Sequence, residues 1–329
     1  MLVLAKAMLA MMIGFILAIL CGLIVIPFMK KVGAKQVMSW SLLQHKKKEG
    51  TPTMGGFIFI IPTVLTIVIL LLTNKLEWSN NLFIILFVFI GYAFLGFVDD
   101  YLIIKRHNNV GLSEMKKLIG QLVIALGFFY LFLKSGHRTE LYIHTLNFRL
   151  QMHWFYGVFL LFILVASSNA VNITDGLDGL AGGLSLVAFL ALGLIAWSST
   201  WVVGYTEIAI FCFILVGALL GYLFYNTYPA KIMMGDSGSL CLGGTMATIA
   251  ILTSHEITFI IIAGVFIIET LSVIIQRTSL MMTGRRVFLM APIHHHFEKL
   301  GWKERDIVKT FWVIGIILAM AGVLFAVWI

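Results

Sequence analysis

The chain has 329 residues, of which 60% are hydrophobic and 12% charged, with a formal net charge of +8 and a mean hydropathy of +1.02. Soluble globular proteins are about 45–50% apolar and about 25% charged. The composition therefore excludes a soluble enzyme, a disordered chain and a small disulfide-stapled secreted domain. It indicates a polytopic membrane protein.

Ten apolar runs follow one another along the chain, and each approaches the roughly 20 residues that a helix needs to cross a bilayer. They cover residues 8–28, 56–73, 81–98, 118–134, 154–170, 180–198, 205–224, 240–254, 257–276 and 309–328. No small-residue cleavage site follows the first run, so we expect it to be retained as a span. The sequence therefore predicts one all-α integral membrane domain over residues 1–329, with about ten transmembrane helices.

The charges of the loops predict the orientation of these spans. The odd-numbered loops carry 18 of the 23 Lys and Arg residues. Short loops that are rich in Lys and Arg stay in the cytoplasm. We therefore expect the odd-numbered loops to be cytoplasmic and both termini to lie outside.

Two connections have patterns of their own. Residues 141–150 alternate apolar and polar side chains around a turn near residues 145–147, which predicts a small external β-hairpin. Residues 287–309 are polar, basic and interrupted by Pro292. Here we expect a cytoplasmic loop with a short amphipathic helix near the lipid headgroups.

The ionisable residues collect at one end of the predicted spans. Every aspartate except Asp306 lies in three cytoplasmic connections, and only Glu269 lies well inside an apolar run. A cation or lipid transporter, which is the alternative from a different functional class, would place ionisable residues near the bilayer midplane. The distribution favours chemistry at the cytoplasmic surface of the membrane.

Asp99 and Asp100 stand at the inner end of the third run. Two adjacent carboxylates at the C-terminal end of a helix face the negative end of the helix dipole and each other. A solvated helix end is the simpler interpretation. A divalent metal, or the role of a general base, would explain a placement that otherwise costs stability.

Residues 169–183 (NAVNITDGLDGLAGG) hold two amides, two carboxylates and four glycines between two spans. Asp175 or Asp178 could cap the following helix. A cap needs only one residue, however, and the glycines allow close backbone approach. A ligand-binding loop accounts better for the whole stretch.

Residues 226–239 follow the seventh run, and Gly235 and Gly238 flank Asp236 there. Capping of the next helix is again the simpler interpretation. Three groups of aspartates on one face would, however, suit Mg²⁺ bound to a diphosphate, because Mg²⁺ favours carboxylates together with substrate phosphates.

Two basic segments are candidates for phosphate contact. His294, His295 and His296 are adjacent and cannot all point the same way, so phosphate contact or proton handling is expected rather than a trihistidine zinc site. Three lysines at 46–48 precede the sequence GTPTMGG at 50–56. They either anchor the loop on anionic lipid or bring it to a phosphate.

These motifs resemble one family in order and spacing: GTPTMGG at 50–56, GFVDDY at 96–101, NAVNITDGLDGLAGG at 169–183, MGDSGS at 234–239 and HHH at 294–296. The chain is similar to the phospho-N-acetylmuramoyl-pentapeptide transferases, within the polyprenyl-phosphate N-acetylhexosamine-1-phosphate transferases. The resemblance covers residues of about 45 to 305 and includes the ten-helix layout. The APIHHHFE stretch at 291–298 is its most specific part.

The resemblance implies a step of peptidoglycan synthesis in a bacterial plasma membrane. Phospho-N-acetylmuramoyl-pentapeptide would pass from UDP-MurNAc-pentapeptide to undecaprenyl phosphate, giving lipid I and UMP, with Mg²⁺ as cofactor. Membrane lipid and a second copy in a homodimer are the further partners expected, and no nucleic acid. The nearest alternative is the same chemistry on UDP-N-acetylglucosamine.

The resemblance also implies roles for individual residues. Asp99 would deprotonate the lipid phosphate, Asp100 would assist it, Asp236 would bind Mg²⁺ with Asp99, and His294 would complete the catalytic set. The substrate-binding residues would be Lys48, Thr53, Lys117, Asn169, Asn172, Asp175, Gly176, Leu177, Asp178, Asn226, Met233, Gln276, His295 and His296.

The chain departs from the family pattern at two positions. Met233 stands where many members have an aromatic residue before MGD, and Ile103 stands where many have a lysine. Lys105, Arg106 or Lys117 would supply the missing charge. Neither change touches the carboxylates.

Two mechanisms are compatible with the sequence. In direct displacement, the lipid phosphate attacks the β-phosphorus of the UDP-sugar, and the protein contributes positioning and charge. In the rival mechanism an aspartyl-phosphosugar forms first.

Overall fold

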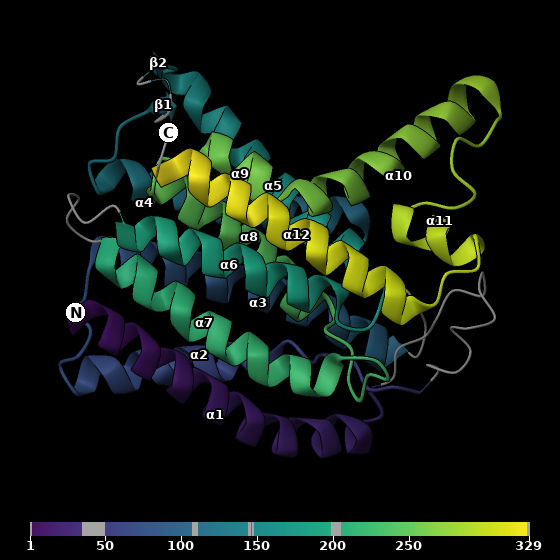
Figure 1. Ribbon diagram of the computed structural model, residues 1–329, viewed down its shortest axis with the longest axis horizontal. Helices are drawn as coiled ribbons and strands as arrows, with labels where there is room; N and C mark the ends of the chain where they lie inside the picture. Colours follow the sequence, from purple (N-terminus) through teal and green to yellow (C-terminus); the bar gives the residue numbers. More distant parts are fainter. Residues whose placement is uncertain are drawn as a thin grey trace.

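The computed structural model describes residues 2–34, 50–106, 111–143, 146, 148–198 and 205–327. Within these ranges a bundle of helices carries one small sheet (Figure 1). The helices are α1 (Leu2–Val32), α2 (Phe57–Leu72), α3 (Asn80–Arg106), α4 (Glu114–Lys134), α5 (Trp154–Thr174), α6 (Leu180–Ser198), α7 (Tyr205–Asn226), α8 (Asp236–Leu252), α9 (Glu256–Ile262), α10 (Gly264–Thr283), α11 (Ile293–Lys299) and α12 (Glu304–Val327).

Each of the ten predicted apolar runs coincides with helix. In the described part of the chain, eight helices are long and apolar enough to cross a membrane, while α2 and α8 are apolar but shorter. The ninth run is interrupted, because Ala263 has a ψ of 8° and separates α9 from α10. The prediction of a mostly helical, multi-pass membrane protein is confirmed.

The centre of the bundle is formed by α7 and α8. In the most apolar 18-residue stretch of α7, 89% of the residues are buried. Every residue of α8 from Ser237 to Leu252 is also buried. α1 packs along α7 at very short range, since a Cβ at Gly217 would lie 2.0 Å from the carbonyl oxygen of Met11. Small residues allow such close approach between membrane helices.

The third helix differs from the prediction in its length. α3 continues past the predicted end at residue 98 to Arg106, because no glycine or proline lies between these two positions and Lys105 and Arg106 suit the negative end of its dipole. Asp99 and Asp100 therefore lie inside the helix, and both are buried. The expectation that the pair stands at a helix end is wrong.

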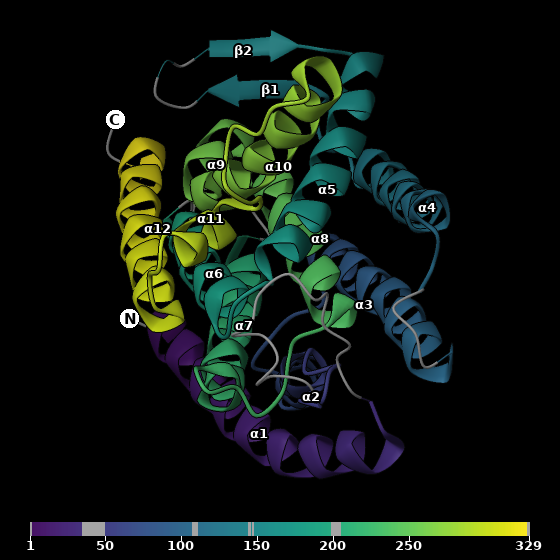
Figure 2. The same cartoon turned by 90° about the vertical axis from the view of Figure 1, so that its right-hand side faces the viewer.

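The predicted hairpin is present. β1 (Glu140–Ile143) pairs antiparallel with β2 (Phe148–Gln151), with Glu140 opposite Gln151. Arg149 on β2 donates to Glu140 at 3.2 Å. α1 begins and α12 ends at the end of the bundle that carries this hairpin (Figure 1), and Figure 2 shows the two strands lying side by side.

The segment after α10 also contains the predicted short helix. α10 projects away from the bundle, and α11 turns back beside its far end (Figure 1). Met281 and Met282 near the end of α10 are 72% and 79% exposed. This return brings the three histidines near the C-terminal end of α5 and against α12.

Candidate active site

Three helices bring two carboxylates to one ammonium group. Nζ of Lys117 lies 3.3 Å from Oδ2 of Asp99 and forms an ion pair with Oδ2 of Asp236. Asp99 comes from the middle of α3, and Asp236 is the first residue of α8. Ser113 caps α4 by accepting from the N–H of Lys116, which places Lys117 in the first turn of that helix. Of Lys105, Arg106 and Lys117, the three candidates for the missing charge, Lys117 is the one that the structure places against these carboxylates.

Asp100 has different partners from Asp99. Its two carboxylate oxygens accept from the backbone N–H groups of Asp236 and Ser237, each at 3.0 Å. Asp100 therefore caps the N-terminus of α8, where the first N–H groups have no partner within the helix. α3 and α8 meet closely here, since a Cβ at Gly96 would lie 2.1 Å from the carbonyl oxygen of Asp236.

Two asparagines on α5 lie near Asp99, Asp236 and Lys117, the three residues that form the carboxylate cluster. Asn172 donates to Oδ1 of Asp236 at 2.7 Å and to the hydroxyl of Ser239 at 2.9 Å. Asn169 lies one turn earlier and donates to Gln121 of α4 at 3.0 Å. Asn172 contacts the carboxylate cluster, whereas Asn169 ties α5 to α4.

Distant residues hold the loop between α5 and α6. Asp178 accepts from the N–H of Ala230 at 2.9 Å, and its own N–H donates to Glu304 at 2.7 Å. The N–H of Gly179 donates to Asn226 at 3.0 Å. Gly179 has a φ of +82°, which glycine adopts without strain.

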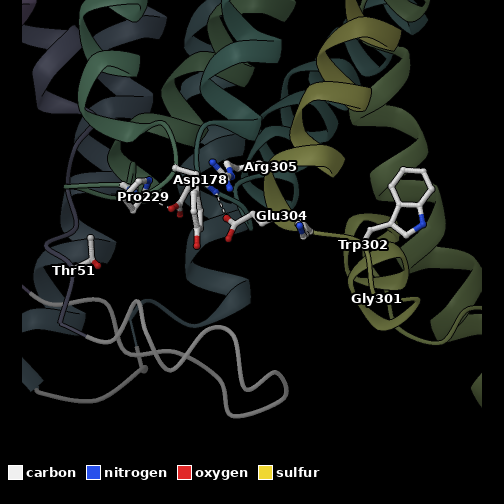
Figure 3. A pocket seen from close by; sticks show the side chains of 10 residues that line it. Thr51, Asp178, Pro229, Gly301, Trp302, Glu304 and Arg305 are labelled. Atoms are coloured by element: carbon white, nitrogen blue, oxygen red, sulfur yellow. Dashed lines mark hydrogen bonds between the residues drawn. The ribbon is translucent and has the colours of Figure 1, made fainter.

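A cavity of about 510 Å³ opens beside this loop. Thr51, Asp178, Tyr228, Pro229, Glu304 and Arg305 are among its lining residues (Figure 3). In its wall the carboxylate of Glu304 points toward the backbone of Asp178, where the dashed line marks the hydrogen bond from the N–H of Asp178 (Figure 3). The cavity joins residues from four separate stretches of sequence.

The segment that begins at Gly50 packs against the residues before Asp236. The N–H of Met233 donates to Pro52, and the N–H of Gly55 donates back to Met233, both at 2.8 Å. Thr53 and Met233 are therefore buried, at 8% and 4% exposure. Lys48 lies outside the described residues.

The three histidines point to different partners, as their adjacency predicts. His294 pairs with Glu269 at 3.0 Å and His295 with Glu298 at 2.6 Å. Nδ1 of His296 accepts from the N–H of Leu289 at 3.1 Å.

Gln276 fixes the loop that leads to these histidines. Its Oε1 accepts from the N–H groups of Val287 and Phe288, and its Nε2 donates to the carbonyl of Phe288. Asn226 is likewise occupied by backbone, because its Nδ2 donates to Ile232 at 2.9 Å. Both amides hold loops rather than facing open space.

Asp175, Gly176 and Leu177 complete the loop that follows α5. Asp175 is the C-terminal capping residue of that helix, and Leu177 is buried at 1% exposure. Gly176 lies against His294, since a Cβ there would be 2.3 Å from Nε2 of the histidine. The loop therefore connects α5, whose Asn172 contacts the carboxylate cluster, with the histidine segment.

Sequence reasoning did not assign Glu304, Trp312 or Ser239 to the site. Nε1 of Trp312 donates to the carbonyl of Gly179 at 3.1 Å, so two residues of α12 hold the α5–α6 loop. The position of Glu304 could have indicated its role. It stands just before the last apolar run, where a carboxyl that becomes buried needs a hydrogen-bond partner.

The donor chemistry of the carboxylate cluster fits Mg²⁺. Among the described residues no group of three or more His, Cys, Asp or Glu side chains forms a metal cage. Asp99 and Asp236 nevertheless share one cationic partner, Lys117. Mg²⁺ commonly takes one or two carboxylates and completes its shell with water and substrate phosphates, so these two residues would hold it.

Comparison with known proteins identifies the family of the chain. The family model described as Glycosyl transferase family 4 matches residues 82–254. Phospho-N-acetylmuramoyl-pentapeptide-transferase of Geobacillus thermodenitrificans is 45% identical over 322 residues, covering 97% of this chain and 98% of the relative. The chain belongs to the phospho-N-acetylmuramoyl-pentapeptide transferase family. The transferase of the same name from Bacillus subtilis is 43% identical, with 97% of both chains covered.

Membership of this transferase family makes the chain a phosphoglycosyl transferase built as a multi-pass membrane protein. The matched range 82–254 contains Asp99, Lys117, Asn172 and Asp236. The histidines and α12 lie beyond it, within the part that the full-length relatives cover. The carboxylate cluster therefore lies within the general glycosyl-transfer region of the chain.

Proposed function

We propose that the chain transfers phospho-N-acetylmuramoyl-pentapeptide from UDP-MurNAc-pentapeptide to undecaprenyl phosphate, giving lipid I and UMP. The observation that carries this proposal is the placement of Lys117 between Asp99 and Asp236. Phosphoryl transfer depends mainly on positioning and on stabilising charge, and this cluster provides both signs of charge at one point. One domain spanning residues 1–329 would carry the whole reaction.

The reaction proposed is a direct displacement. An oxygen of the lipid phosphate bonds to the β-phosphorus of the nucleotide sugar, the bond to the bridging oxygen breaks, and UMP leaves. Asp99 takes the proton of the lipid phosphate through Oδ2, while its Oδ1 stays fixed by the N–H of Leu112 at 2.7 Å. Lys117 neutralises phosphate charge, and Asn172 holds Asp236 in place.

Mg²⁺, held by Asp99 and Asp236, would neutralise the diphosphate and stabilise the leaving phosphate. Asp100 acts as a positioning residue, because its carboxylate is fully engaged by the start of α8. We assign His294 to the catalytic set and the loop containing Asp175 and Asp178 to the nucleotide and diphosphate. We also assign Lys48, Thr53, Asn169, Gly176, Leu177, Asn226, Met233, Gln276, His295 and His296 to substrate binding, with Asn226 and Gln276 acting through the loops that they hold.

We propose that the site faces the cytoplasm and that both termini lie outside, with ten spans counting α2 and α8. The start of α1 and the end of α12 share one end of the bundle with the hairpin (Figure 1), which an even number of crossings requires. The last turns of α1 and α3, which carry Lys30, Lys31, Lys105 and Arg106, lie at the other end, and the positive-inside rule assigns such basic ends to the cytoplasm. Labelling of a single introduced cysteine at Gly136 or at Arg285 in intact cells would check the orientation.

A homodimer and bound membrane lipid remain predictions. Mass measurement of the protein in lipid nanodiscs would check both. A monomer that retains full activity would contradict a functional dimer.

UMP release tests the proposed function. Purified protein in detergent is incubated with undecaprenyl phosphate and either UDP-MurNAc-pentapeptide or UDP-N-acetylglucosamine, with and without Mg²⁺. Mg²⁺-dependent release from the muropeptide nucleotide alone is expected. UMP release from UDP-N-acetylglucosamine alone would instead assign to the chain the transfer of N-acetylglucosamine phosphate. A covalent phosphosugar–protein adduct isolated without lipid would refute direct displacement.

A further inference from the structure

One carboxyl group lies within the apolar stretch of α10 and pairs with a histidine from α11. Oε2 of Glu269 lies 3.0 Å from Nδ1 of His294, and neither side chain is exposed. A buried ionisable group in an apolar helix costs free energy unless a hydrogen bond compensates it. His294 provides that compensation from 25 residues away.

This contact distinguishes the two nitrogens of the imidazole. An ionised carboxylate can only accept, so with Glu269 ionised the proton shared by the pair is on Nδ1 of His294. Nε2 is then the nitrogen that remains for proton exchange or for a ligand. In the part of the chain that the structure describes, Nε2 has no hydrogen-bond partner, and neither has Oε1 of Glu269.

The remaining nitrogen faces the loop after α5. A Cβ placed on Gly176 would lie 2.3 Å from Nε2 and 2.9 Å from Cε1 of His294, so glycine leaves room for the ring. Gly176 follows Asp175 and precedes Asp178, which lines the cavity of about 510 Å³. The imidazole is thus held between the membrane helix α10 and the loop we assign to the diphosphate.

We propose that Glu269 is a positioning residue of the transferase site. It fixes the ring and the tautomer of His294 so that Nε2 is directed at the Asp175–Asp178 loop. The inference rests on the proposed function, because it assigns Glu269 to that same site. Carboxylate partners of histidines commonly fix ring orientation in this way, and their loss costs about 10–100-fold in activity.

Glu256 offers a matched control. It is a second buried glutamate, 1% exposed, and its Oε1 accepts from the hydroxyl of Tyr156. It lies at the start of α9, on the far side of Ala263 from Glu269, and has no place in the proposed site. If Glu269 served only to stabilise the fold, replacing Glu269 and replacing Glu256 would have similar effects on kcat.

The kinetic test compares Glu269→Met, Glu269→Asp and Glu256→Gln in detergent. Glu269→Met is expected to lower kcat by about 10–100-fold with KM for the nucleotide sugar nearly unchanged, since methionine suits an apolar helix but cannot accept from Nδ1. Glu269→Asp should restore part of the rate, and Glu256→Gln should leave kcat within twofold. An equal fall in kcat for Glu256→Gln would overturn the proposal.

A double-mutant cycle tests whether Glu269 acts through His294. In a His294→Ala background, Glu269→Met should cause no further loss. A further loss as large as in the wild-type background would show that the carboxyl acts elsewhere.

A readout independent of turnover separates this inference from the proposed function. Protein labelled with ¹⁵N-histidine should show a His294 resonance pair, assigned by its absence in His294→Ala, with the proton on Nδ1. This pattern should change in Glu269→Met and persist in Glu256→Gln. An unchanged tautomer in Glu269→Met would overturn the inference even in an active enzyme. Absence of UMP release would overturn the proposed function while the tautomer result still stood.

Discussion

Nζ of Lys117 lies 3.3 Å from Oδ2 of Asp99 and also pairs with Asp236, so one ammonium joins α3, α4 and α8. The side chain of Lys117 is 21% exposed, whereas that of Asp99 is 4% exposed. A partly open cation between two carboxylates is suited to meet an incoming phosphate, because charge placed in advance requires no reorganisation during the reaction.

Lys117→Met should lower kcat by about 100-fold or more, as does the loss of one preorganised donor to a developing charge. Lys116→Met is the control, because Lys116 is the exposed neighbour in the same helical turn. UMP release under saturating Mg²⁺ measures both variants. Equal rates for the two variants would show that the ammonium of Lys117 takes no part.

Asp99→Asn and Asp100→Asn should have different consequences although the residues are adjacent. Asp100 accepts from two N–H groups at the start of α8, and an amide keeps only one accepting oxygen. Loss of a hydrogen bond to a charged group costs about 1.5–3 kcal/mol, so Asp100→Asn should lower Tm. Asp99→Asn should abolish turnover with a smaller change in Tm. Matching unfolding curves for the two variants would contradict this assignment.

Much of the fold follows from the sequence, because crossing a bilayer demands long apolar runs and each run became helix. The polar stretches between runs also drew attention to Asp99, Asn172 and Asp236, since carboxylates and amides gather there beside glycines that allow close backbone approach. The difference between Asp99 and Asp100 could not be predicted. Adjacent residues on a helix point about 100° apart, and which one meets α8 depends on how α3 packs.

Long-range pairs were equally inaccessible to sequence patterns. Glu304 reaches the N–H of Asp178 across 126 residues, and His294 reaches Glu269 across 25. No local periodicity encodes either contact. Glu269 was visible only as a lone carboxyl in an apolar run, which indicates that a partner exists but not which one.

Glu304→Ala should weaken binding of the nucleotide sugar more than it slows the chemical step. The carboxyl of Glu304 fixes the backbone of Asp178 beside the cavity (Figure 3), and its removal leaves that buried N–H without its acceptor. We expect KM to rise about tenfold, which corresponds to about 1.4 kcal/mol, with kcat little changed. Glu304→Gln keeps an accepting oxygen and should retain most of the affinity.

Asp306→Ala is the matched control for Glu304, because Asp306 is exposed in the same turn of α12. Initial rates across a range of UDP-MurNAc-pentapeptide concentrations separate KM from kcat. A fall in kcat alone for Glu304→Ala would place the residue nearer the reacting atoms than the structure does.

Glu256 should make stability depend on pH at the hairpin end of the protein. Burial raises the pKa of its carboxyl from 4.5 to about 7. Between these values the unfolded chain has released the proton while the folded protein retains it, so stability falls as pH rises. Stability is therefore fully present below about pH 4.5 and declines until about pH 7, by about 3 kcal/mol.

Glu256→Gln removes this titration while it keeps a group that can accept from Tyr156. The variant should flatten the fall of Tm between pH 4.5 and 7 relative to the parent protein, because glutamine binds no proton in either state. Thermal unfolding in one detergent at a series of pH values measures this difference. Parallel curves for the parent and the variant across that window would show that another group controls the pH dependence.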